Sequence, residues 1–262
     1  MATASRYSQV LELIFSRKYK RGASEIEFDR DEIIATAAEL GFTVKNVGDL
    51  VYSFRYRARL PASIQKAAGD RMWIIRPAGT ARYRLVLVPM RDFTPNQNIM
   101  PIKVPDATPG IVARYALSDE QALLAKLRYN RLIDTFTGIT CYSLQSHLKT
   151  SVPELGQVET DELYVGVDKR GAQFVIPVQA KGGRDRLNMV QIEQDMALCA
   201  NRFAELTCRP IGAQFMGTDV IAIFEFAMTD EGVMIATERH YRLVAPDDLT
   251  AQDLIAYRET AD

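Results

Sequence analysis

Apolar residues recur at helical spacing through the first part of the chain. They lie three or four positions apart in Tyr7–Phe15, in Asp31–Leu40, which Gly41 follows, and in Val47–Tyr56. Spacing of this kind places side chains on one face of an α-helix. We therefore expect three short helices in this part of the chain.

The pattern then changes to that of strands. Met72–Ile75 and Tyr83–Val88 are apolar-rich runs on either side of Pro77-Ala78-Gly79. A turn sequence between two such runs predicts a β-hairpin. Three short helices followed by a hairpin is the element order of a winged helix-turn-helix, so we predict a winged-helix-like DNA-binding domain over residues 1–90.

A proline-rich stretch follows this domain. Five prolines lie from Pro89 to Pro109. Proline interrupts helices and cannot donate a hydrogen bond within a central strand. We expect residues 91–116 to be a connector, with room for a short edge strand.

The remaining residues, 117–262, mix helical and strand patterns. Ser118-Asp119-Glu120-Gln121 has the form of a capping box, and the helix it opens is expected to end at Gly138. A strand, a turn and a strand are expected over Val158–Ala180, followed by a helix near Leu187–Leu206. Further strands are expected near residues 211–215, 220–228 and 233–243. The chain is thus expected to be an α/β (α+β) protein whose C-terminal domain is a mixed sheet flanked by helices.

Composition narrows the class of protein. A chain of 262 residues with 47% apolar and 25% charged residues can bury its own core without disulfides or a structural metal. No apolar run approaches the roughly 18 residues of a membrane-spanning helix, and Met1–Arg6 shows no basic segment leading into an apolar one. We expect no membrane association, no secretory signal and, because the three cysteines lack metal-ligand spacing, a reducing cytoplasm.

Charge is divided unevenly along the chain. The total of 32 Lys and Arg against 33 Asp and Glu gives a net charge of −1. Up to Met90, however, 15 basic residues face 9 acidic ones, a balance of +6, whereas the rest has 17 against 24, a balance of −7. The near-neutral total therefore does not exclude nucleic acid as a partner of the basic part.

A basic run marks the end of the third expected helix. Ser53–Arg59 contains three arginines at alternate positions with a tyrosine between them. Such side chains make phosphate contacts and base-edge contacts in a major groove, and the alternative is a solvated basic helix face. The residues predicted to bind double-stranded DNA are Lys45, Asn46, Arg55, Tyr56, Arg57 and Arg59.

The expected hairpin over Val158–Ala180 has a defined turn. The segment from Asp168 to Ala172, with Gly171 at a left-handed position, fits a three-residue loop. If Asp168 pairs with Ala172, the register of the two strands is fixed from the turn to the open end of the hairpin.

That register brings four polar residues together. It sets Asp161 opposite Gln179 and Glu159 opposite Lys181, with all four side chains on one face. Carboxylate and amide oxygens are ligands for a magnesium ion that keeps several waters, and a lysine beside the ion can orient the attacking water. The pattern therefore predicts phosphodiester hydrolysis, and the alternative is a solvated ion pair between Glu159 and Lys181.

At this point the sequence resembles a known family. Asp161, then 17 residues, then Gln179-Ala180-Lys181 on the second strand of a hairpin, followed by a helix, is similar to the core of the PD-(D/E)XK nuclease superfamily, particularly its restriction-endonuclease-like members. The resemblance covers roughly Leu117 to Met228. It implies that Asp161 binds the metal, that Gln179 occupies the second acidic position and that Lys181 is the catalytic lysine.

The sequence departs from the family at Gln179, where the family usually has Asp or Glu. The amide oxygen of Gln179 is still a metal ligand, but it attracts a cation less strongly. We expect Glu159 or the carbonyl of Ala180 to complete the Mg²⁺ site. The supporting candidates on the flanking helices are Glu120, which precedes the hairpin, and Gln191 and Glu193, which follow it.

The helix expected after the hairpin has two kinds of side chain. Ile192, Met196, Cys199 and Phe203 recur at helical spacing and are expected to face the core. The polar residues assigned to its opposite side are Asn188, Gln191, Gln194 and Asp195.

Together these patterns predict a Mg²⁺-dependent, sequence-specific DNA endonuclease of the type II restriction kind. The resemblance implies hydrolysis of phosphodiester bonds in double-stranded DNA to a 5′-phosphate and a 3′-hydroxyl. Because two strands must be cut, we expect a homodimer. Two alternatives stay open: a DNA repair or junction-resolving nuclease with the same core, and a non-catalytic winged-helix DNA-binding regulator.

Overall fold

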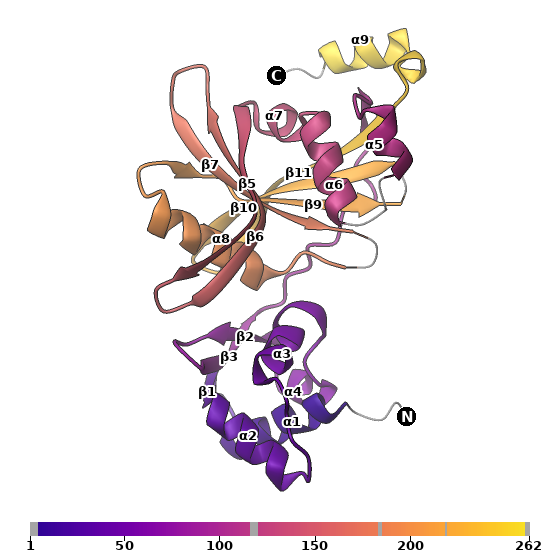
Figure 1. Ribbon diagram of the computed structural model, residues 1–262. Coiled ribbons are helices and arrows are strands. Elements are labelled where there is room, and N and C mark those ends of the chain that lie inside the picture. The colour runs from indigo at the N-terminus through magenta and orange to yellow at the C-terminus, as the bar shows by residue number, and fades with distance from the viewer. Residues whose placement is uncertain (1–4, 116–119, 183–184, 218, 260–262) are drawn as a thin grey trace. The chain divides into compact units, whose positions relative to one another are not determined.

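The chain divides into two compact units in a computed structural model that describes residues 5–115, 120–182, 185–217 and 219–259 (Figure 1). The first unit runs up to Asp92 and takes in Thr150–Val158 and Asp230–Gly232. The second holds the other described residues. Each unit has a hydrophobic core of its own.

The first unit combines short helices with a three-stranded antiparallel sheet. Its described helices are α1 (Arg6–Lys18), α2 (Arg30–Glu39), α3 (Val47–Tyr52), the π-helical turn η1 (Ser53–Arg57) and α4 (Ala62–Lys66). Its strands are β1 (Glu25–Asp29), β2 (Arg71–Pro77) and β3 (Arg82–Pro89), in the order β1-β3-β2. The three helices and the hairpin expected from the sequence are therefore present, while β1 and α4 were not anticipated.

Local sequence explains where these helices begin and end. Asp29 and Glu32 form a reciprocal capping box at the start of α2. The third expected helix is α-helical only to Tyr52, because the backbone N–H of Ala58 donates to the carbonyl of Ser53, 2.7 Å away and five residues back. The prediction of a continuous α-helix to Tyr56 was therefore wrong in its last turn, which is π-helical.

The second unit is built on a curled mixed sheet. The strand order is β4-β11-β10-β9-β7-β6-β5, and β8 pairs with β7 beside it. The strands are β4 (Ile102–Pro105), β5 (Thr140–Val152), β6 (Gly156–Val167), β7 (Gln173–Lys181), β8 (Thr207–Cys208), β9 (Ile211–Met216), β10 (Val220–Thr229) and β11 (Gly232–Val244). Neighbours β6 and β7 are antiparallel, whereas β9 runs parallel to β7 and β4 runs parallel to β11.

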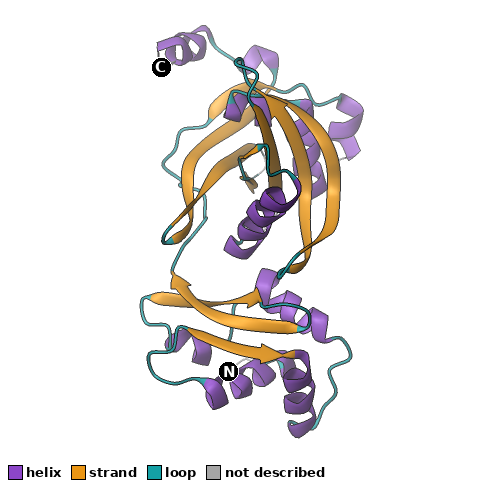
Figure 2. Cartoon of the chain, turned by 90° about the vertical axis from the view of Figure 1, so that its left-hand side faces the viewer, coloured by secondary structure: helices purple, strands orange, loops and turns teal. Residues whose placement is uncertain are grey.

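Helices lie on both faces of this sheet. The described helices are α5 (Gly110–Tyr115), α6 (Glu120–Tyr129), α7 (Leu132–Thr137), α8 (Met189–Arg202), the 3₁₀ turn η2 (Pro246–Asp248) and α9 (Ala251–Glu259). Apolar residues of α6 and α7 pack against Ile176, Val178 and Ala180 of β7. Helix α8 contacts the side chain of Gln179, which points to the opposite face of β7. Figure 2 shows the strands curving around α8.

The sequence prediction needs corrections in this unit, where strand β5 and helix α9 were not anticipated. The single helix expected to end at Gly138 is two helices, α6 and α7, because Arg131 adopts a left-handed conformation with φ 48° and interrupts it. Gly138 does end α7, with φ 69°. The expected capping box begins at Ser118 and Asp119, which lie outside the described residues. The connector contains the short edge strand β4, but also the unexpected helix α5.

The hairpin register is as predicted from its turn. The six backbone pairs of β6 and β7 run from Glu162 opposite Val178 to Val167 opposite Gln173. The N–H of Asp168 donates to the carbonyl of Ala172 at 3.0 Å, and Gly171 is left-handed with φ 85°. Asp161 and Gln179 are the next residues beyond the Glu162–Val178 pair, towards the open end of the hairpin.

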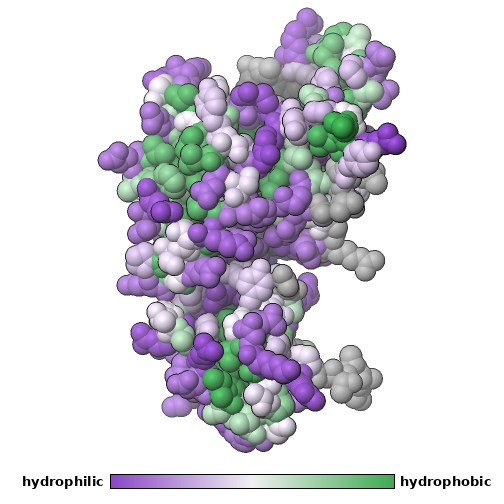
Figure 3. Space-filling view, viewed as in Figure 1, coloured by the Kyte–Doolittle hydropathy of each residue, from purple (hydrophilic) through white to green (hydrophobic). Residues whose placement is uncertain are grey.

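The surface of this unit is not uniformly polar. Figure 3 shows a hydrophobic area on the side where β5 and β7 are labelled in Figure 1. Tyr142 and Leu144 of β5 and Val167 of β6 are exposed large apolar residues. The outer strands of the sheet therefore present apolar side chains at the surface.

Within the described residues, every helix is too short or too polar to cross a membrane.

Candidate active site

Strand β7 carries polar side chains into a buried position where it ends. Val175, Ile176 and Val178 are fully buried apolar residues of this strand, and Gln179 and Lys181, which follow them, are 0% and 8% exposed. A buried polar or charged side chain is costly unless it is paired or used. The end of β7 is therefore a candidate site on burial alone.

Asp161 meets β7 with its side chain instead of its backbone. The N–H of Ala180 donates to Oδ2 of Asp161 at 2.8 Å, just beyond the last backbone pair of the two strands. The carboxylate thus replaces a main-chain acceptor where β6 and β7 separate. Asp161 is only 9% exposed, so its position is fixed by the sheet.

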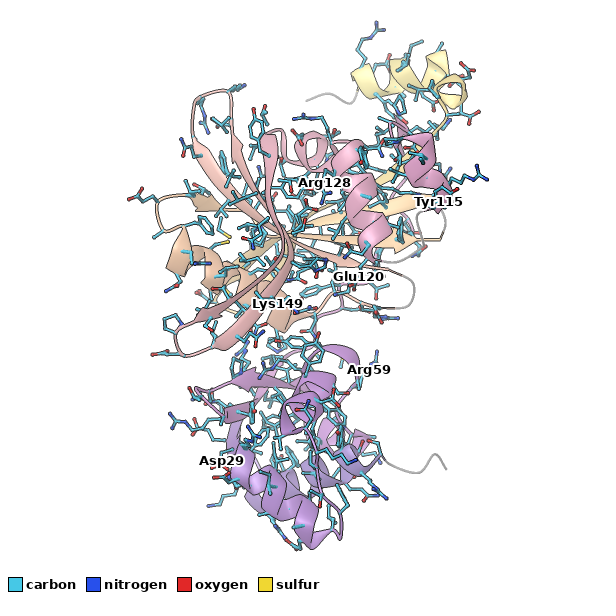
Figure 4. All side chains as sticks on the ribbon, in the orientation of Figure 1. Asp29, Arg59, Tyr115, Glu120, Arg128 and Lys149 are labelled. Carbon is cyan, nitrogen blue, oxygen red and sulfur yellow. The ribbon has the colours of Figure 1, made fainter. Side chains whose placement is uncertain are left out.

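Lys181 is held by the helix that precedes the hairpin. Its Nζ lies 3.1 Å from Oε1 of Glu120, in the first turn of α6. The ion pair between Glu159 and Lys181, which was the alternative to a metal site, is not formed: the carboxylate of Glu159 instead lies 3.2 Å from Nζ of Lys149 on β5. Figure 4 marks Glu120 and Lys149. The weak candidate Glu120 is therefore part of the cluster, and the side chain of Glu159 is not bound to it.

Gln179 is bound from both sides through its side-chain NH₂ group. Nε2 donates to Oδ2 of Asp195 on α8 at 2.9 Å and to the backbone carbonyl of Glu159 at 3.2 Å. Asp195 is 1% exposed. The buried acid Asp195 of α8 therefore contacts Gln179, the neutral residue of the cluster.

Burial disfavours the charged forms of Asp161 and Asp195. Desolvation raises the pKa of Asp161 above its usual range, and the charge of Lys181 and the hydrogen bond from Ala180 partly offset that shift. Burial also raises the pKa of Asp195 to about 8, against the opposing hydrogen bond from Gln179. Perturbed acids beside a buried lysine are typical of functional sites.

The donor set can be tested against the expected Mg²⁺. Among the described residues no three Asp, Glu, His or Cys side chains gather into a metal cage. Yet Oε1 of Gln179 is buried and has no hydrogen-bond partner in the described part of the chain. With the carboxylate of Asp161 and the backbone carbonyl of Ala180, it supplies hard oxygens for an ion that keeps most of its waters. The residues present therefore fit Mg²⁺ bound by few protein ligands.

Asp195 is the site residue that sequence reasoning missed. The expected supporting residues of α8, Gln191 and Glu193, are half-buried, and the hydrogen bonds of the cluster described above go to other residues. Asp195 accepts one of them, although it had been assigned only to the polar side of the helix and was not named as a site residue. It lies three residues after Ile192 and four before Cys199, both buried. A charged residue at core spacing was the signal available in the sequence.

A strained residue borders the cluster on β5. His147 has φ 48°, a left-handed conformation that few residues other than glycine adopt. Its Nε2 lies 2.7 Å from the side-chain amide nitrogen of Gln121 on α6, the residue after Glu120. No sequence pattern had placed His147 near the site.

The predicted DNA-binding residues lie in the first unit. Lys45 and Arg59 are exposed (Figure 4 marks Arg59), and the side chain of Asn46 caps α3 by accepting from the N–H of Asp49 at 3.2 Å. The guanidinium carbon of Arg55 lies 5.5 Å from the ring centre of Tyr56. The side chain of Arg57 lies outside the described residues. The basic run is thus placed on a π-helical turn and the residues after it.

No protein-family model, curated protein or solved structure matches this chain.

Proposed function

We propose that the chain is a Mg²⁺-dependent DNA endonuclease of the PD-(D/E)XK type, with a restriction-endonuclease-like second unit and a winged-helix-like first unit. The observation that carries the proposal is the buried cluster of Asp161, Gln179 and Lys181 where β6 and β7 separate. An acid, a free amide oxygen and a lysine in one buried place are the groups that phosphodiester hydrolysis requires.

The surrounding fold supports the same proposal. The cluster lies at the open end of a hairpin, and the chain continues into α8 and then into β9, which runs parallel to β7. This is the hairpin and helix that the resemblance predicts around an acid and a Gln-x-Lys. In the first unit, the helices and the β2–β3 hairpin support the winged-helix proposal.

Each residue of the cluster has a proposed role. Asp161, Oε1 of Gln179 and the carbonyl of Ala180 would hold Mg²⁺, which when bound supplies positive charge to the phosphate and activates a water. Lys181 stabilises the negative charge that develops on the phosphate and orients the water. Glu120 positions the ammonium group of Lys181 through their 3.1 Å contact.

The first unit is proposed to hold the substrate. Its basic excess over residues 1–90 favours a polyanion. Exposed Lys45 and Arg59, with Arg55 and Tyr56 between them in the sequence, would contact the phosphates and base edges of double-stranded DNA. Because both strands have to be cut, we propose that the enzyme acts as a homodimer.

Replacing the lysine tests the catalytic role. Lys181→Ala is expected to lower the rate of Mg²⁺-dependent DNA cleavage by about a thousandfold, because the charge beside the phosphate is removed. Its affinity for DNA should stay within about threefold of the wild type, since the predicted DNA-binding residues are elsewhere. The measurement is single-turnover cleavage of plasmid DNA, paired with a binding titration in Ca²⁺.

Lys169→Ala is the matched control. Lys169 is an exposed residue in the turn of the same hairpin, so its removal should leave the cleavage rate within about twofold of the wild type. Cleavage by Lys181→Ala at the rate of this control would contradict the assignment.

A further inference from the structure

The side-chain amide of Gln179 has only one orientation open to it. Its Nε2 donates to two acceptors, Oδ2 of Asp195 at 2.9 Å and the carbonyl of Glu159 at 3.2 Å. A backbone carbonyl has no hydrogen to donate. Turning the amide over would place its oxygen against the carbonyl of Glu159, a repulsion that no protonation state of Asp195 removes, so the NH₂ group faces these two partners.

The fixed NH₂ group leaves the amide oxygen on the other side. Oε1 of Gln179 is buried without a hydrogen-bond partner among the described residues. A buried oxygen in that state has lost its hydrogen bonds to water without replacement, which is unfavourable. Two hydrogen bonds therefore hold the amide in an arrangement that its oxygen does not favour. Such an arrangement suits an oxygen kept ready for a ligand.

We propose that Asp195 is a positioning residue, which orients Gln179 so that the oxygen of the amide, and not its NH₂ group, faces the metal position. Asp195 acts through Gln179 and does not bind the metal itself. This inference rests on the proposed function, because it takes Oε1 of Gln179 as a ligand of the cation. It also explains the neutral residue at position 179, since the acid stands one hydrogen bond behind the strand, on α8.

Three variants separate orientation from simple packing. Asp195→Leu replaces the acceptor by a larger apolar side chain, whereas Asp195→Asn keeps both the volume and an oxygen that Nε2 of Gln179 can reach. Gln179→Ala removes the residue through which Asp195 acts. Asn201→Leu is the control, because Asn201 is an exposed residue of the same helix.

The first readout is the affinity for Mn²⁺, measured by calorimetry on the full chain. Asp195→Leu is expected to bind Mn²⁺ about tenfold more weakly than the wild type, the usual effect of removing a partner that orients a ligand. Asp195→Asn and Asn201→Leu should stay within about threefold. Asp195→Leu should have no further effect in the Gln179→Ala background, because the residue it orients is gone.

The second readout does not depend on the metal. In the NMR spectrum of the metal-free protein, the side-chain NH₂ protons of Gln179 should exchange slowly with water in the wild type and Asp195→Asn, and much faster in Asp195→Leu. Equal exchange in all three would overturn the inference. So would a wild type that binds Mn²⁺ with an affinity that Asp195→Leu leaves unchanged.

The two proposals fail in different ways. A wild type that binds no Mn²⁺ and shows slow NH₂ exchange would overturn the proposed function and the role of Gln179 as a ligand, while leaving the hydrogen bond from Asp195 in place. Binding that is insensitive to Asp195→Leu would overturn the positioning role alone.

Discussion

Asp161 lies where burial disfavours its ionised form. Burial raises its pKa, and the nearby charge of Lys181 and a hydrogen bond from Ala180 offset that shift only in part. A carboxylate that served the fold alone would be better replaced by a neutral acceptor. The charge at position 161 is explained if it serves a cation.

Asp161→Asn separates these two roles. Without metal, we expect its free energy of unfolding to be equal to that of the wild type or up to about 1 kcal/mol higher, because the amide oxygen still accepts from Ala180 and no charge is buried. The rise in melting temperature caused by Mg²⁺ should disappear, since the charged ligand is gone. Urea unfolding in EDTA and thermal melts with and without Mg²⁺ measure the two effects. A decrease of more than about 2 kcal/mol in EDTA would show that Asp161 is structural.

Gln179 and Lys181 are also polar side chains whose burial is unfavourable for folding and is explained by the proposed site. Both end a strand whose preceding residues are fully buried and apolar. Their neighbours on α6 and α8, Glu120 and Asp195, hold them in place. At the scale of single residues, the site is a set of polar groups that the sheet buries and the two helices orient.

At the scale of elements, α9 depends on a few polar contacts. None of its described residues is buried. The carboxylate of Asp253 accepts from the N–H of Thr250 at 2.9 Å and from Nζ of Lys103 on β4 at 2.9 Å, and Oη of Tyr257 accepts from the N–H of Lys103 at 2.9 Å. The attachment of α9 to the sheet is therefore sensitive to the charge of Asp253.

The hydrogen bonds from Thr250 and Lys103 lower the pKa of Asp253 to about 2. A group with a lowered folded pKa stabilises the folded state above its unfolded pKa of about 4, and that contribution is lost as the pH falls through about 2. We expect the amides of α9 to lose protection from hydrogen exchange between pH 4 and pH 2. Asp253→Asn should show the low protection already at pH 7, with little change below pH 4. Equal protection in the variant and the wild type at pH 7 would contradict this account.

How far the sequence predicts these elements depends on what fixes each of them. The β6–β7 register followed from the turn, because loop length and the left-handed Gly171 set which residues face each other. Strand β5 was missed because most of its residues are exposed and only Cys141, Leu148 and Val152 are buried. Its position at the edge of the sheet comes from pairing with β6, which leaves no alternating pattern in the sequence.

The candidate site shows the same division. Asp161, Gln179 and Lys181 were found from spacing along one hairpin, where the geometry is local. The ion pair of Lys181 with Glu120 joins two elements that are distant in sequence, so local patterns named Glu120 only as a supporting candidate and offered Glu159 as the alternative partner of Lys181. Asp195 was not proposed as a site residue because its polarity placed it opposite the core face of α8, although it is buried in the structure.

In the whole molecule, the part proposed to bind DNA and the part proposed to cut it carry opposite net charges. Residues 1–90 carry the basic excess and the remainder carries the acidic excess, which adds up to a net charge of only −1. If the first unit binds DNA as proposed, binding would be local, through a few of its cations, and each phosphate contact would release counterions.

The salt dependence of DNA binding reports the number of phosphates that the first unit neutralises. The double substitution Lys45→Ala and Arg59→Ala is expected to weaken binding uniformly across sequences. It should also reduce the slope of log affinity against log salt concentration by about 2, one for each side-chain cation removed. Fluorescence anisotropy with duplexes in Ca²⁺ at several salt concentrations measures the slope. An unchanged slope would place the DNA-binding surface elsewhere.

The central claim is that this chain cuts DNA with Mg²⁺ at the Asp161, Gln179 and Lys181 cluster. The most direct test is to incubate plasmid DNA with the wild-type chain and Mg²⁺ and to sequence the ends of the products. The account predicts discrete fragments that share one recognition sequence, carry 5′-phosphates and 3′-hydroxyls, and are absent with EDTA or with Lys181→Ala. Intact plasmid with Mg²⁺, from protein that binds the same DNA, would contradict it and favour a non-catalytic DNA-binding regulator.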